Sequence, residues 1–118
     1  MNMLRAQILA CFVVPEPTHE GDLLDRAVQS ETVAWYVLDV TARPLRELSS
    51  AEIEALSDTK AKVTSEAEAM VADRLLDRPD PQLERHHAPP SGAYILTRAG
   101  ALLAMAVLAR SKEGAAHA

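Results

Sequence analysis

The chain of 118 residues is expected to form a single domain over 1–118, with one hydrophobic core that buries roughly two-thirds of its unfolded surface. Hydrophobic residues make up 48% of the chain but aromatic residues only 3%, so the core must consist of aliphatic side chains and alanines, which favours helices. The formal net charge of -5 argues against nucleic-acid binding over the whole surface.

The single cysteine, Cys11, cannot form an intrachain disulfide, and no secretory signal pattern opens the chain. We therefore expect a cytoplasmic protein. The longest apolar runs are shorter than the ~20 residues that span a bilayer, so we predict no membrane segment. Cys11 lies in an apolar run without a nearby base, which favours a buried, inert thiol over a nucleophile. The sequence predicts no enzymatic activity, no cofactor and no metal site.

The first part of the chain contains an N-terminal segment, 1–17, and the beginning of a helical core, 18–112. Residues 3–14 fit a helix or a strand, and two prolines end either element. Thr18 is a suitable N-cap for a helix that begins near residue 19 and runs to Thr41, with Ser30 as the place for a break. A strand over residues 32–40 is the alternative, but we favour the helix.

Two interpretations remain open for residues 50–77. Ser49 and Glu52 have the spacing of a capping box, so a helix begins here. Ser57, Asp58 and Thr59 are all capping residue types, which permits a break and a second helix from Thr59. No glycine or proline forbids one uninterrupted helix, however. The first interpretation indicates a helix-turn-helix, and the second indicates an arm of a helical bundle.

The last part of the chain has the order of a β-ribbon followed by a helix. Residues 79–92 are rich in proline and are expected to form a loop. A short strand should follow at Tyr94–Leu96, and a long apolar helix should run from Arg98 to Gly114. We expect Thr97 to cap this helix and Gly100 to allow its close approach to the ribbon. Residues 113–118 are expected to form a mobile tail.

The residues from Tyr94 to Gly100, YILTRAG, together with those from Leu75 to Pro81, LLDRPDP, resemble winged-helix transcriptional regulators of the MarR type. In that family a helix-turn-helix precedes a β-wing, whose return strand ends in Tyr-x-Leu-Thr-x-x-Gly before a dimerisation helix. The resemblance implies a mainly α fold with a small β-ribbon, a single winged helix-turn-helix-like domain. It also implies a small DNA-binding regulator that acts as a homodimer.

The same resemblance implies which residues would contact double-stranded DNA. The helix from Thr59 would be the recognition helix, and its exposed side chains would meet the major groove: Thr59, Lys60, Lys62, Thr64 and Ser65. Arg85, His86 and His87 at the wing tip would lie near the phosphate backbone or the minor groove. Arg98 belongs to a stretch from Arg85 to Lys112 that contains four basic residues and no acidic one, which would form a local basic face.

The alternative function is that of an acidic helical adaptor or oligomerisation module that binds another protein. The acidic residues Glu66, Glu68, Asp73 and Asp77 fit a solvated helix face, or an interaction surface for a basic partner. Two further patterns favour plain structural roles. Trp35 and Tyr36 fit packing better than a ligand pocket, and His86 and His87 fit a solvated loop better than a metal site.

Overall fold

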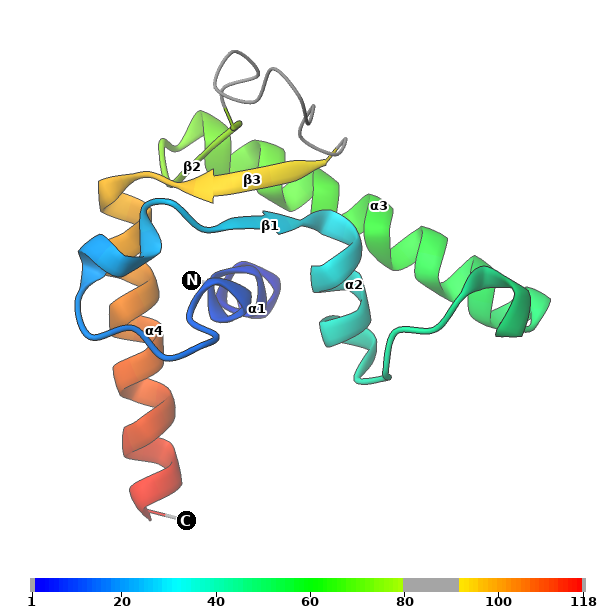
Figure 1. Ribbon diagram of the computed structural model, residues 1–118, viewed down its shortest axis with the longest axis horizontal. Helices are drawn as coiled ribbons and strands as arrows, with labels where there is room; N and C mark the ends of the chain where they lie inside the picture. The colour runs from blue at the N-terminus through cyan, green and yellow to red at the C-terminus, as the bar shows by residue number, and fades with distance from the viewer. Residues whose placement is uncertain (1, 80–91, 118) are drawn as a thin grey trace.

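The protein, described by a computed structural model over residues 2–79 and 92–117, is mainly helical and carries one small antiparallel sheet (Figure 1). For residues 114–117 the description covers the backbone alone. The elements in chain order are α1 (Met3–Phe12), η1 (Glu20–Leu23), β1 (Ala27–Gln29), α2 (Ser30–Leu38), η2 (Leu45–Glu47), α3 (Ser50–Ala72), β2 (Leu76–Asp77), β3 (Ala93–Leu96) and α4 (Arg98–His117).

The sheet has the strand order β1-β3-β2, so the last strand in sequence lies between the other two. Val28 pairs with Tyr94, and Leu76 pairs with Leu96. The expected strand at Tyr94–Leu96 is therefore confirmed, and it forms the ribbon with β2. The expected loop over residues 79–92 lies almost wholly outside the described residues.

The expected long helix over residues 19–41 is wrong. Residues 20–23 form a single 3-10 turn, and residues 27–29 form strand β1 before α2 begins at Ser30. Thr18 does not cap a helix, because its backbone and hydroxyl both donate to the Asp22 carboxylate. Ser30 is the place where the helical pattern breaks, as expected, and Asp39 ends α2 by adopting a left-handed conformation with φ of 57°.

Residues 50–72 form one uninterrupted helix, which agrees with the second interpretation, and a helix-turn-helix within residues 50–77 is wrong. The expected capping box is present, since Ser49 and Glu52 exchange hydrogen bonds through their side chains and backbone. The expectation that a recognition helix begins near Thr59 is wrong, because Thr59 lies inside α3. The capping residue types at 57–59 do not begin a helix there. The helix ends before residue 77, at Ala72, because Arg74 takes a left-handed φ of 61° and Leu75 donates back to the Met70 carbonyl.

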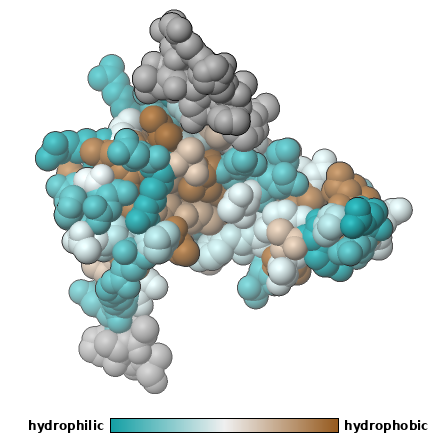
Figure 2. All heavy atoms as spheres, in the orientation of Figure 1, coloured by the Kyte–Doolittle hydropathy of each residue, from teal (hydrophilic) through white to brown (hydrophobic). Residues whose placement is uncertain are grey.

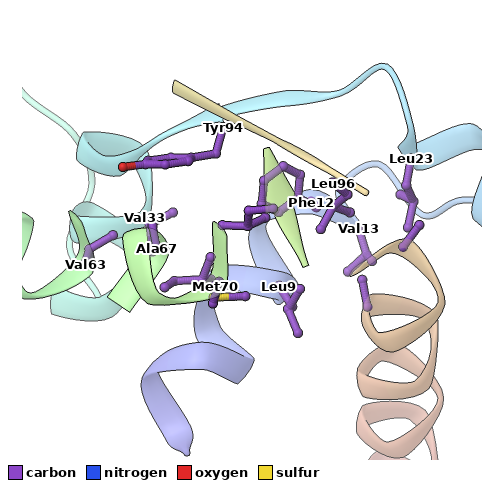
Figure 3. Close-up of a cluster of buried hydrophobic side chains, with 14 residues drawn as sticks. Leu9, Phe12, Val13, Leu23, Val33, Val63, Ala67, Met70, Tyr94 and Leu96 are labelled. Carbon is purple, nitrogen blue, oxygen red and sulfur yellow. The ribbon is translucent and has the colours of Figure 1, made fainter. Parts of the chain in front are cut away.

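One hydrophobic core joins the helices α1 to α4, the sheet and η1, whereas η2 contributes no buried residue (Figure 3). The undecided segment 3–14 is helical, and its Leu9 and Phe12 are almost wholly buried at the centre of this core. Met70 of α3 and Leu96 of β3 lie in the same cluster. The N-terminal segment is therefore a core element, and its removal would expose the apolar faces of α3, α4 and the sheet.

The ribbon and α4 make a close backbone contact at their junction. The Thr97 hydroxyl accepts from the Gly100 backbone at 3.1 Å, which confirms the expected cap, and donates to the Arg74 carbonyl at 2.6 Å. A Cβ atom on Gly100 would lie 1.9 Å from the Leu75 carbonyl oxygen, which confirms that glycine permits the close approach. The backbone of α4 runs past Gly114 to His117, so the expected helix end at Gly114 is wrong.

Replacing Gly100 with alanine should destabilise the protein by at least about 2 kcal/mol, because the added methyl group meets backbone rather than a flexible side chain. The control is Ala99→Ser on the exposed neighbouring position, which should change stability by less than about 1 kcal/mol. Urea denaturation of the two variants measures the difference. Equal stability of both would show that the junction adjusts freely.

Candidate nucleic-acid interface

The flank of α3 that faces the ribbon carries two of the expected DNA contacts. Lys60, Thr64 and Glu68 are spaced four residues apart, so they form one row along the helix. Glu68 fixes the direction of that row, because its carboxylate pairs with Arg78, beyond β2, and accepts from the Tyr94 hydroxyl of β3 at 3.2 Å. Lys60 is exposed and Thr64 is half-buried. The row therefore leads from the exposed part of α3 directly to the ribbon.

A second pair of expected contacts lies on the outer face of α3. Lys62 and Ser65 are both exposed and three residues apart, so they are neighbours. Lys62 lies roughly 200° around the helix from Lys60, because each residue turns an α-helix by about 100°. The exposed acids Glu54 and Asp58 share this outer face with Lys62. Lys62 thus lies among exposed acidic side chains, whereas Lys60 lies on the flank that leads to the ribbon.

The remaining expected contacts are not brought together with this row. Thr59 is half-buried and lies on the side of α3 away from Thr64. Arg98 is exposed at the first turn of α4, next to the Thr97–Arg74 hydrogen bond and roughly 20 Å along α3 from Lys60. Arg85, His86 and His87 lie outside the described residues. Of the five expected contacts on α3, Lys60 and Thr64 therefore form one pair, and Lys62 and Ser65 form a second pair on another face. Thr59 lies apart from both pairs.

Three acids of the expected acidic face make contacts within the chain. Arg5 of α1 donates to Glu66 at 2.8 Å and to Asp73 at 2.9 Å, and Asn2 donates to Glu66 at 3.1 Å. The hydrogen bond from Arg5, followed by that from Asn2, holds the pKa of Glu66 below its ordinary value of 4.5. The hydrogen bond from Arg78 likewise lowers the pKa of Glu68. These acids tie α1 and the ribbon to α3 and do not form one solvated stripe.

The structure also describes the surroundings of Cys11 and of the side chains that could hold a metal ion. Cys11 is half-buried, and burial raises the pKa of its thiol to about 11, so the thiol is protonated at neutral pH. Within residues 2–79 and 92–117, no group of three or more His, Cys, Asp or Glu side chains is arranged to hold a metal ion. No helix in the described part of the chain has the length and apolar character needed to cross a membrane.

Comparisons with known proteins leave the chain without an assigned relative: no protein-family model, no curated protein and no solved structure matches it. The candidate interface consists of one exposed lysine on the ribbon flank, a second on the outer face and a ribbon joined to α3 through Glu68.

The link between Arg5 and Glu66 should make stability depend on pH in a defined direction. A carboxylate whose pKa is lowered by folding stabilises the protein above its unfolded pKa, and this contribution is lost as the pH falls through the folded pKa. Glu66→Gln should therefore cost about 1 kcal/mol at pH 7 and progressively less below pH 4.5. Chemical denaturation across pH measures this, with exposed Glu54→Gln as the control. A cost that stays constant down to low pH would contradict the assignment.

Proposed function

We propose that the protein is a small DNA-binding transcriptional regulator of the winged-helix type, which acts as a homodimer in the cytoplasm and performs no enzymatic reaction. In this proposal α2 and α3 form the helix-turn-helix unit, the β2–β3 ribbon is the wing, and α4 is the dimerisation helix. The helix-turn-helix thus includes α2, and the recognition helix is the whole of α3 rather than a helix from Thr59.

The observation that carries the proposal is the row that begins at Lys60 and ends at the ribbon through Glu68. A winged helix contacts DNA with its recognition helix and its wing together, so both must present residues to one side. Lys60 and Thr64 lie on the flank of α3 whose next turn contacts Arg78 and Tyr94. The order of α2, α3, ribbon and α4 agrees with this assignment.

Electrostatics favour the ribbon flank over the outer face as the DNA-facing side. Glu54 and Asp58 on the outer face would repel phosphates, and both lie more than 100° around the helix from Lys60.

The connection 39–49 is longer than the three- or four-residue turn of most helix-turn-helix units. It contains η2, and the ion pair between Arg43 and Glu52 attaches it to the first turn of α3. The capping box of Ser49 and Glu52 also defines where α3 begins after this longer connection.

Lys60→Ala should weaken binding to duplex DNA and lower the slope of log affinity against log salt by about one per protomer, since one phosphate contact is lost. The matched control is Lys62→Ala, which makes the same charge change on the outer face and should have a smaller effect. Fluorescence anisotropy with pooled genomic duplexes at several salt concentrations measures both. Equal losses from both variants, or none from either, would remove the ribbon flank from the proposal.

The apolar surface of α4 supports the dimeric part of the proposal. Leu102 is 53% exposed, and an open groove of about 210 Å³ is lined by Leu103, Ala106, Val107 and Arg110. The C-terminal half of α4 extends beyond the other elements in Figure 1. A second α4 packed along this helix would bury these side chains and place two recognition helices on one DNA duplex.

Leu102→Asp should weaken dimerisation by about tenfold or more without unfolding the monomer, because the side chain is exposed in the monomer and would be buried in the dimer. Sedimentation at several protein concentrations measures the change, and circular dichroism checks the fold. Arg110→Ala, in the neighbouring groove lined also by Leu103, Ala106 and Val107, should have a smaller effect. An unchanged monomer–dimer equilibrium in Leu102→Asp would place the dimer interface elsewhere.

A further inference from the structure

A small apolar pocket lies between the end of α2 and the first turns of α3. It is lined by Trp35, Leu38, Val40, Glu52 and Ala55, and it encloses about 120 Å³. We call it the α2–α3 pocket. An apolar cavity of roughly 150 Å³ holds a benzene molecule, so this pocket suits one aliphatic side chain. Its rim is open, since Val40 is 46% exposed and Ala55 is also exposed.

The chain segment from Asp39 to Asp58, which contributes Val40, Glu52 and Ala55 to the pocket, carries an excess of acidic residues. Residues 39–58 contain five acids and two bases, and one of those bases, Arg43, is already paired with Glu52. Figure 2 shows apolar surface next to hydrophilic surface where the N-terminal part of α3 protrudes from the molecule. An apolar anchor point within a negative rim selects for the opposite charge pattern in whatever binds there.

The end of α2 adds a second source of negative potential beside the pocket. The last turn of α2 has no basic residue, so the negative end of its helix dipole is uncompensated within the helix. Asp39, immediately after that turn, adds a carboxylate although its left-handed backbone would suit glycine or asparagine equally well. A cation placed here would interact favourably with both the carboxylate and the carbonyl end of the helix.

We propose that the α2–α3 pocket binds a protein segment in which an aliphatic side chain is flanked by lysine or arginine. The aliphatic side chain fills the space against Trp35, Leu38 and Ala55, and the flanking cations lie against Asp39 and the C-terminal end of α2. A nucleic acid does not fit this site, because its phosphates would face the acidic rim.

The proposed site is separate from the DNA-facing flank. Ala55 lies roughly 140° around α3 from Lys60, so the pocket opens on a different side of the helix from the row that leads to the ribbon. A duplex on the ribbon flank would leave this pocket uncovered. This proposal does not rest on the proposed function, since the pocket and its charge exist whether or not α3 binds DNA.

Trp35 provides a direct readout, because it is the only tryptophan in the chain and lines the pocket. The probe is a short synthetic peptide with leucines flanked by lysine and arginine, titrated while Trp35 emission is recorded. We expect a saturable change that weakens as salt is added. A peptide with glutamate in place of the basic residues, and one with serine in place of the leucines, should each bind at least about tenfold more weakly.

Two variants locate the binding to the pocket. Ala55→Arg puts a long cationic side chain at the rim of the pocket and should weaken peptide binding at least about tenfold, whereas Ala61→Arg, exposed on another face of α3, should not. Asp39→Asn keeps a residue type that tolerates the left-handed backbone and should weaken binding severalfold. Circular dichroism confirms that each variant is folded.

The proposal would be overturned by no saturable change with the basic peptide, by equal binding of the glutamate peptide, or by equal losses in Ala55→Arg and Ala61→Arg. A change of oligomeric state in Ala55→Arg would also overturn it, because the pocket would then be covered by a second copy of the chain. DNA binding measured in the same variants separates this result from the proposed function, since Ala55→Arg leaves the ribbon flank intact.

Discussion

The structure depends on the close contact between Gly100 of α4 and the Leu75 carbonyl, where a Cβ atom would lie 1.9 Å from the oxygen. This contact joins the end of α3, strand β2 and the start of α4 at one place. Thr97 completes the junction by bonding both to the Arg74 carbonyl and to the Gly100 backbone. Because α3 and α4 are fixed here, the ribbon between them has a defined base, and α1 packs against both helices through Leu9 and Phe12. This junction, together with the contacts of Glu68 with Arg78 and Tyr94, sets the direction of the α3 row relative to the ribbon.

The parts of the fold that the sequence predicted are those with a local chemical cause. Thr97, Gly100 and the pair Ser49 and Glu52 act within a few residues of themselves, and their expected roles are confirmed. Strand β1 was missed because its three residues gain their conformation from pairing with β3, which lies far along the chain. The ends of α2 and α3 were missed because Asp39 and Arg74 adopt left-handed conformations that usually indicate glycine or asparagine. Capping residue types at 57–59 permitted a break in α3, but packing of Leu56 and Val63 on one face supports a continuous helix.

The arrangement of charge could not be predicted from residue types alone. Lys60 and Lys62 are close in sequence, yet helical geometry directs them to different faces, and only Lys60 lies on the flank that leads to the ribbon. Glu66 and Asp73 were expected on a solvated face but are bound by Arg5, from a helix whose existence the sequence left open. The first turns of α3 and the end of α2 line an apolar pocket that includes Glu52 and lies beside Asp39. Opposite flanks of one helix thus carry the two proposed binding surfaces, one for phosphates and one for a basic protein segment.

The most direct test of the account is to map a DNA duplex onto the protein by NMR, using amide chemical shifts of the isotope-labelled chain. A duplex chosen from bound genomic fragments should perturb amides around Lys60 and Thr64 and in the ribbon, and should leave those around Trp35 and Ala55 largely unchanged. Perturbations that increase at low salt and follow one binding curve would agree with a single DNA-facing flank. A duplex that causes no shifts at low salt, or shifts centred on the outer face around Asp58 and Lys62, would contradict the account.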